Sequence, residues 1–491
     1  MTIFVRTADS PRLPPPANGS GARGWLYVNL FAGPFQTALT LLFGATILWL
    51  GCTLFKFAVL DGVWNGVDRN ACLASPSGAC WPLVREKFGQ WIYGFYPIDQ
   101  RWRADICFAL VAAVSLPMLV PAFPFKRTNG FLLVIALPLA VVILLSGGNL
   151  AFGPGSYVAV AVTLLLFTVL VPIAPIGMSE VFQKNRVYVL AASIALIGSI
   201  CSAVLARSGS ITGTSEATLD LLVCLTVAAG VIAVVALAVR RQFTTRQGLG
   251  LLALWTTVFV GMMALDYDFG LSTVDTAQWG GLLVTLIVAV VGIITSLPFG
   301  IVLALGRQST MPFVRALSVG FIEIVRGVPL ITVLFMSSVM LPLFLPPGVS
   351  FDKLLRALIG VALFSSAYMA EVVRGGIQAI GRGQYEGAAA LGLSYWPMMV
   401  KVILPQALKV SIPNIVSNFI SLFKDTTLVL IIGVFDLLGI VQTTLRDPKW
   451  ATPTAAATGY LAVALIYWVF CFGMSRYANY TERRLHRGHK A

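Results

Sequence analysis

Residues 384–407 read QYEGAAALGLSYWPMMVKVILPQA and lie between two long apolar runs. The alanine-rich residues 383–391 favour a helix, and Gly392 allows the sharp turn that ends it. Ser394 suits the N-cap of a second helix, whose first turn accepts Pro397. The segment therefore predicts a compact, largely uncharged helical hairpin that fits a groove on a cytosolic partner. An ordinary cytoplasmic loop helix is the alternative interpretation.

The composition is that of a membrane protein. Hydrophobic residues make up 58% of the 491 residues, and charged residues make up only 11%. Such a chain consists of membrane spans with short connections. The net charge of +14 raises the possibility of a nucleic-acid partner. The basic residues, however, lie in short loops between apolar runs, so the charge indicates topology and we expect no nucleic acid.

Twelve apolar runs approach the roughly 20 residues that a helix needs to cross a bilayer. They lie near 36–56, 104–122, 129–147, 157–177, 187–206, 218–239, 247–265, 281–305, 327–346, 354–374, 408–434 and 458–475. Residues 1–35 are polar and contain many prolines and glycines, so we expect a disordered cytoplasmic arm there. The sequence thus predicts an all-α integral membrane protein of about 12 transmembrane helices.

The loop charges predict the direction of the spans. If the N-terminus is cytosolic, most of the Lys and Arg residues in the short connections fall on the cytosolic side, as does the C-terminal tail. The outer loops at 148–156 and 266–279 contain neither residue type. This asymmetry follows the positive-inside rule. It places 384–407 and both termini in the cytosol and the long loop 57–103 outside.

The segment 384–407 resembles the E-A-A loop of ABC importer permeases, in the polar-amino-acid branch (the HisM type). The matching positions are Glu386, Ala388, Ala389, Gly392, Leu404 and Pro405. Gly387 stands where the family usually has alanine. In that family the loop is a coupling helix, which docks on the ATPase subunit and converts ATP-driven closure into movement of the membrane helices. The resemblance therefore implies that these residues couple transport to ATP.

The resemblance covers residues 270–491, less than half of the chain. Further matching segments are 281–286, 323–330, 366–377 and 419–433. It implies a C-terminal five-helix core of a type I ABC importer permease, with the coupling loop near 382–407. Residues 36–265 add an N-terminal extension of about seven spans. A chain with such an extension is similar to the long permease subunits of general L-amino-acid importers, the AapM/BztC type.

This family implies a function and a set of partners. The chain would be the permease subunit that moves L-amino acids into the cytoplasm across a bacterial inner membrane. Two ATPase subunits, a periplasmic amino-acid-binding protein and a second permease subunit are implied, the last favoured to be a shorter related chain. We expect no enzymatic activity, because the sequence contains no Gly-Lys dipeptide and hence no Walker loop. No cofactor is expected in this chain, since ATP and Mg would bind to the ATPase subunits, and no metal site is expected.

The sequence argues against two other functions, a secondary transporter and a membrane enzyme. A twelve-span secondary transporter would show related halves and a Gly-x-x-x-Asp-Arg-type loop after its second span. The chain reads PAFPFKR at 121–127 instead. A membrane enzyme would need His, Asp or Glu clustered near one face, and the sequence shows no such cluster.

Two similar phrases place charges at the ends of apolar runs. They are Glu323-Ile-Val-Arg326-Gly327 and Glu371-Val-Val-Arg374-Gly375. In each phrase the charged residues are three apart and share a helical face. A charge at mid-bilayer costs about 3 kcal/mol on insertion scales, so each one needs a reason. The four are either interfacial ion pairs or a cytoplasmic gate whose pairs exchange partners between helices, with the adjacent glycines permitting the motion.

Residues 412–427 read IPNIVSNFISLFKDTT, which is apolar enough to insert but unusually polar for a span. We expect Pro413 to disrupt the helix near its start. The polar side chains form one stripe, which either makes hydrogen bonds between helices or lines the substrate path. Candidates for that path are Asn414, Ser417, Asn418 and Ser421, with Lys424, Asp425 and Thr426 near its outer end. Many family members have glutamate at the position of Asn418, so narrow selectivity for basic amino acids is not expected.

Cys72 and Cys80 are the two cysteines in the long outer loop. Seven residues separate them, and the compartment outside the inner membrane is oxidising. We therefore expect them to form a disulfide.

Overall fold

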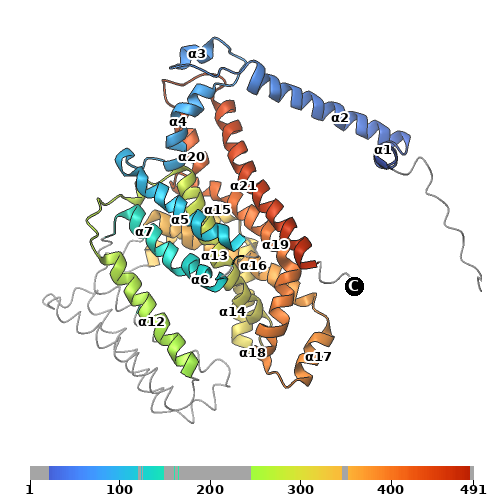
Figure 1. The fold of residues 1–491 in the computed structure, drawn as a ribbon, viewed down its shortest axis with the longest axis vertical. Helices are drawn as coiled ribbons and strands as arrows, with labels where there is room; N and C mark the ends of the chain where they lie inside the picture. Colours follow the sequence, from blue (N-terminus) through green and yellow to red (C-terminus); the bar gives the residue numbers. More distant parts are fainter. Residues whose placement is uncertain are drawn as a thin grey trace, which may run out of the picture. The chain divides into compact units, whose positions relative to one another are not determined.

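The computed structural model describes residues 21–119, 123, 125–148, 160, 164, 245–344 and 352–486, and the regular structure in these ranges is helical (Figure 1). Residues 1–20 lie outside the described residues, as do the predicted spans 157–177, 187–206 and 218–239 apart from residues 160 and 164. The count of about twelve spans therefore stays a prediction.

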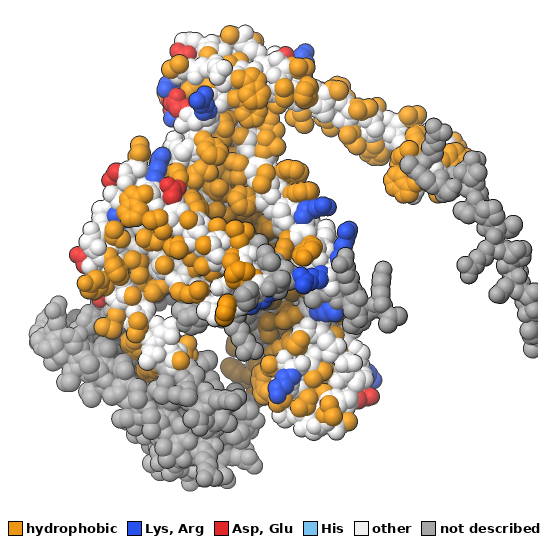
Figure 2. Space-filling model, viewed as in Figure 1, with side chains coloured by type: hydrophobic (Ala, Val, Ile, Leu, Met, Phe, Trp, Pro, Cys, Tyr) orange, Lys and Arg blue, Asp and Glu red, His pale blue; other side chains and the backbone are white. Residues whose placement is uncertain are grey.

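Five helical segments in the described part of the chain are long and apolar enough to cross a membrane. They are Pro34–Leu60, Gly281–Arg307, Lys353–Gln378, Tyr395–Ile432 and Ala455–Arg484. A sixth candidate is the pair Pro312–Gly327 and Leu330–Leu343, whose axes meet at 107°. If the pair is one span, the described residues after 280 hold five candidate spans, the number predicted for the C-terminal core. On the face seen in Figure 2, hydrophobic side chains cover much of the helix surface.

The bent pair differs from the straight span predicted at 327–346. Helix α14 (Pro312–Gly327) ends before Val328, and α15 (Leu330–Phe335) starts after Pro329. Val328 is extended, with φ −113° and ψ 138°, because a residue that precedes proline is driven out of the helical region. Hydrophobicity alone did not reveal this break.

Three helices form the centre of the core and pack closely. They are α13 (Gly281–Arg307), α16 (Lys353–Gln378) and α19 (Leu404–Asp425). A Cβ atom at Gly300 would lie 2.8 Å from Met369 Cβ, and one at Gly376 would lie 2.1 Å from Ser411 Oγ. Small residues at these crossings let the helix backbones approach. Gly376 is therefore a packing residue between α16 and α19.

The described part of the N-terminal extension contains further helices. They are α1 (Gly21–Leu30), α2 (Pro34–Phe55), α3 (Arg69–Leu73), α4 (Trp81–Tyr93), α5 (Arg101–Leu119), α6 (Lys126–Phe131), α7 (Leu137–Ser146) and α12 (Thr245–Asp266). Helix α1 lies inside the arm that we expected to be disordered. Over these ten residues the expectation was wrong, because the polar and proline-rich part of the arm ends before the apolar residues 25–28.

The described chain divides into two compact units. The first comprises Met1–Phe88 with Val441–Ile466, and the second comprises Gly89–Ile440 with Tyr467–Ala491. In the first unit, a disulfide joins Cys72 to Cys80, whose Cα atoms are 5.5 Å apart. Ion pairs Lys87–Asp447 (2.6 Å) and Lys449–Glu86 (2.8 Å) connect its two segments. In the sequence, these two segments stand before and after residues 89–440 of the second unit.

The second unit holds all of the residues predicted to act in coupling, gating and transport. Its C-terminal part contains α17 (Arg382–Ala390), α18 (Tyr395–Met398), a π-helical turn at Met399–Ile403 and a 3₁₀ segment at Thr426–Ile432. Helices α20 (Leu437–Thr444) and α21 (Ala455–His486) complete the chain, and each crosses from one unit into the other.

Candidate functional site

The segment 384–407 forms the predicted helical hairpin. Helix α17 ends at a turn in which Gly392 has φ +70°, a value that favours glycine. The Gly392 N–H donates to the Ala389 carbonyl at 2.9 Å, and the Leu393 N–H donates to the Ala388 carbonyl at 3.2 Å. Ser394 occupies the N-cap position of α18, although its side chain makes no capping hydrogen bond. The turn thus reverses the chain through backbone hydrogen bonds alone.

One face of the hairpin is held against the helix bundle. Ala388 is buried, and Tyr385 packs against an apolar cluster that includes Met369 and Val373 of α16. This partial burial raises the pKa of the Tyr385 hydroxyl above its ordinary value. Leu404 packs against the same cluster. The hairpin is therefore attached to the bundle by its own side chains, so a force on it reaches the membrane helices.

A side-chain hydrogen bond connects the two ends of the hairpin. Gln406 Nε2, in the first turn of α19, donates to Gln384 Oε1 of α17 at 3.0 Å. It also donates to the Val402 carbonyl at 2.9 Å. Pro405 lies beside it in the first turn of α19, where proline is tolerated.

The opposite face of the hairpin exposes large apolar side chains. Leu391 is 80% exposed, and Tyr395, Trp396 and Val400 are also exposed. We call these four residues the apolar knob. Glu386 and Ala389 are exposed on α17 as well. An exposed apolar cluster rimmed by polar residues marks a surface for another protein. The sequence analysis did not single out the knob residues, although Leu, Tyr and Trp in a loop between two spans were a visible signal.

Glu371 lies at the centre of an ion-pair network that joins three helices. Arg307 Nη1, at the end of α13, is 2.7 Å from Glu371 Oε1 and 2.9 Å from Glu323 Oε1. Arg374 Nη2 is 2.6 Å and Arg326 Nη1 is 3.7 Å from Glu371 Oε2. The Glu371 side chain is only 15% exposed, whereas that of Glu323 is 54% exposed. Loss of its arginine partners would therefore destabilise the less exposed Glu371 carboxylate more than that of Glu323.

Only one of the two pairs suggested by the three-residue spacing is present in the described part of the chain, and the other ion pairs of the network join different helices. The Glu371–Arg374 pair is present, but Glu323 contacts Arg307 rather than Arg326 among the described ion pairs. Arg326 instead lies 5.7 Å from the centre of the Tyr368 ring as well as near Glu371. Arg307 was not predicted as a member of this network, although it lies at the end of α13, two residues beyond the apolar run 281–305.

The polar stripe of α19 has no covering helix in the described structure. Asn414, Ser417, Ser421 and Lys424 are exposed, and Asn418 is half-buried. The opposite face of α19 is packed into the bundle and carries buried residues such as Ile415 and Leu422. None of the four Asn and Ser side chains hydrogen-bonds another helix within the described residues. The structure therefore gives no support to hydrogen bonding between helices of this chain as the role of the stripe.

Two residues at the outer end of the stripe are less exposed than Asn414, Ser417, Ser421 and Lys424. Thr426 is buried, and its hydroxyl donates to the Phe423 carbonyl at 2.8 Å. Asp425 is half-buried at the end of α19. Helix α19 also runs through Pro413 without interruption, so the predicted break there was wrong. Proline removes one backbone hydrogen bond, but the buried residues Ser411 and Ile415 on either side of it in the sequence anchor the helix to the bundle.

Comparison with known proteins identifies relatives over the full length of the chain. Residues 296–487 match the family described as binding-protein-dependent transport system inner membrane component. The glutamate/glutamine/aspartate/asparagine transport system permease protein BztC of Rhodobacter capsulatus is 41% identical and covers 100% of this chain and 99% of its own. The inner membrane amino-acid ABC transporter permease protein YhdY of Escherichia coli is 39% identical and covers 97% of each chain. A solved structure of an amino acid ABC transporter is 30% identical over 42% of this chain and 92% of its own, with a TM-score of 0.37.

Proposed function

Since this chain belongs to the family of binding-protein-dependent transport system inner membrane components, as an amino-acid ABC transporter permease, we propose that its hairpin couples ATP hydrolysis by partner subunits to the import of L-amino acids. The observation that carries this proposal is the apolar knob, with Leu391 80% exposed on a hairpin whose other face is fixed to the bundle. Leu391 precedes the candidate span that starts at Tyr395, and an exposed apolar cluster rimmed by polar residues fits a protein partner.

The partners follow from this function. We place the ATPase subunits, two copies, against the knob on the cytosolic side of a bacterial inner membrane, with both termini of this chain cytosolic. A periplasmic amino-acid-binding protein delivers the substrate to the outer side. A second permease subunit, a shorter related chain, faces the polar stripe of α19. The absence of a covering helix over that stripe among the described residues supports this placement, because exposed amides and hydroxyls within a span are costly in contact with lipid.

The stripe of α19 is the proposed substrate path. An amino acid is a zwitterion, so its path needs hydrogen-bond donors for the carboxylate and acceptors for the ammonium group. The side chains of Asn414 and Asn418 supply both, and Ser417 and Ser421 add hydroxyls. Uncharged amides that bind the backbone groups shared by all amino acids suit broad selectivity. The name of the relative BztC, which includes acidic and amide amino acids, agrees with a path that has an exposed Lys424 at its end.

The network around Glu371 is the proposed cytoplasmic gate. It connects the ends of α13, α14 and α16, so it breaks when these helices separate on the cytosolic side. Because Arg307 contacts two carboxylates, Glu323 and Glu371, it can keep one partner while it loses the other. Such an exchange lowers the cost of opening relative to the loss of an isolated buried pair.

A double variant tests the coupling role. Gly392→Pro is incompatible with φ +70°, and Glu386→Lys reverses the only acidic charge on α17. We expect ATP-dependent uptake to fall steeply while the complex still assembles in part and the binding protein still captures substrate. Gly387→Ala is the matched control, because a Cβ there meets nothing within 4 Å and alanine favours the helix. Normal uptake by a well-expressed double variant would refute the coupling assignment.

A further inference from the structure

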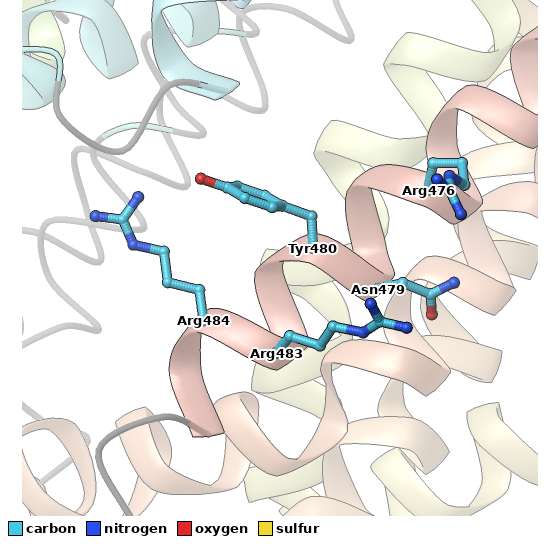
Figure 3. A pocket seen from close by; sticks show the side chains of 5 residues that line it. All are labelled: Arg476, Asn479, Tyr480, Arg483 and Arg484. Atoms are coloured by element: carbon cyan, nitrogen blue, oxygen red, sulfur yellow. The ribbon is translucent and has the colours of Figure 1, made fainter.

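The C-terminal end of α21 carries a pocket lined by positive and polar side chains. The described residues that line it are Arg476, Asn479, Tyr480, Arg483 and Arg484, and its volume is about 630 Å³ (Figure 3). At 3.6 residues per turn these five side chains fall within an arc of about 140° around the helix. The coupling hairpin, the gate network and the polar stripe share no residue with this pocket.

These side chains offer hydrogen-bond donors that carry positive charge. Each arginine has five N–H donors and no acceptor, and the Asn479 amide and the Tyr480 hydroxyl can donate as well. In the part of the chain that the structure describes, none of the three arginines lies within 4.0 Å of a carboxylate oxygen. The acidic Glu482 is outside the arc. Arginine forks match the oxygens of a phosphate group in pairs, so the pocket fits a phosphate-bearing anion.

The position of the pocket along α21 matches the surface of the bilayer. A helix needs roughly 20 residues to cross the hydrocarbon, and α21 starts at Ala455, so Arg476 falls at the boundary. Arg483 and Arg484 follow about two turns later. Side chains of a helix lean toward its N-terminus, which here is the membrane side. Figure 3 shows Arg483 extending back along the helix toward Arg476, the membrane side, and Arg484 extending outward on the side of Tyr480.

An apolar track continues from the pocket into the membrane. Val469 is 60% exposed and Phe472 is 49% exposed. They precede Arg476 by seven and four residues, so they lie on the same face of the helix. The Arg476 guanidinium lies 5.8 Å from the centre of the Phe472 ring. One face of α21 thus presents an apolar surface followed by positive charge, which is the order of an acyl chain followed by its headgroup.

We propose that this face of α21 binds an anionic phospholipid, with its phosphate in the pocket and an acyl chain along the apolar track. The proposal takes from the proposed function only that this end of α21 meets the cytosolic leaflet. The experiment measures lipid binding, so the lipid proposal can fail while the transport function holds, and the transport function can fail while the lipid proposal holds. Free phosphate has the same head chemistry but no acyl chain, and a site for free phosphate would not need the track.

The test measures lipid retained by the assembled transporter in nanodiscs of phosphatidylcholine with or without phosphatidylglycerol. The variant R476Q/R483Q/R484Q removes the three pocket charges. The variant R69Q/R315Q/R446Q is the matched control, since it removes three exposed arginines elsewhere. We expect the pocket variant to lose about 100-fold in affinity for phosphatidylglycerol, at about fivefold for each arginine, and the control to bind as the unaltered protein does.

Three results would overturn the proposal. The first is equal binding of phosphatidylglycerol and phosphatidylcholine by the unaltered transporter. The second is an equal loss in the pocket variant and the control, which would indicate a general effect of charge. The third is displacement of the lipid by millimolar inorganic phosphate, which would indicate a site for a soluble anion. Native mass spectrometry of the complex, with subunit composition as the check on assembly, reads all three.

Discussion

Truncation of Leu391 to alanine should weaken the attachment of the ATPase subunits without unfolding the permease. The Leu391 side chain is 80% exposed, so its removal leaves no cavity in the bundle. Full burial of a leucine side chain contributes about 1.5–3 kcal/mol. If docking buries the exposed four-fifths of the side chain, and alanine keeps part of that stabilisation, the variant loses about 1–2 kcal/mol of binding free energy. This corresponds to roughly 5- to 30-fold in the dissociation constant.

The assay is a titration of ATPase subunits onto the permease complex in nanodiscs, with biolayer interferometry as the readout. Leu343→Ala is the matched control, because Leu343 is 78% exposed and lies outside the hairpin. We expect the control to bind the ATPase with an unchanged dissociation constant and an unchanged melting temperature. A Leu391→Ala variant that binds within twofold of the unaltered chain would refute docking through the apolar knob.

Three further predictions concern other parts of the chain. A double-mutant cycle between Arg307 and Glu371 should give a coupling energy of about 0.5–3 kcal/mol in a denaturation assay, and a value of zero would remove the network from the gate. The hydrogen bond from Lys449 lowers the pKa of Glu86. The stability that this pair contributes is therefore present above the ordinary carboxyl pKa and is lost as the pH falls below it. Lys449→Gln should flatten this acid dependence in tryptophan-fluorescence melts of the transporter. Asn418→Glu should shift competitive uptake toward Arg and Lys and away from acidic amino acids, and an unchanged profile at normal expression would place the substrate path elsewhere.

The hairpin shows what local sequence can predict. Its turn at Gly392 follows from one glycine after an alanine-rich helix, since a positive φ is available to glycine at little cost. The end of the first helix of the hairpin was predictable from the same glycine. The exposure of Leu391 was not predictable, because which side of the hairpin packs against the bundle depends on residues of other helices, such as Met369 and Val373 of α16.

The ion-pair network shows where local reasoning stops. Spacing of three residues predicted the Glu371–Arg374 pair, because such pairs meet on one helix. The same spacing failed for Glu323, whose partner Arg307 lies on α13. A contact between helices depends on how they cross, and the sequence shows this only through the small residues at the crossing. Glu323 and Arg326 lie on the same helix, α14, so their spacing alone did not decide the partner of Glu323.

The central claim is that ATP drives amino-acid import through this permease by way of its hairpin. The most direct measurement is uptake of a radiolabelled amino acid into proteoliposomes that contain the whole transporter and its binding protein, loaded with ATP or with a non-hydrolysable analogue. The account predicts uptake with ATP only, unchanged when ionophores dissipate the ion gradients, and abolished by Gly392→Pro. Uptake that persists without ATP hydrolysis and disappears with the ion gradients would contradict it.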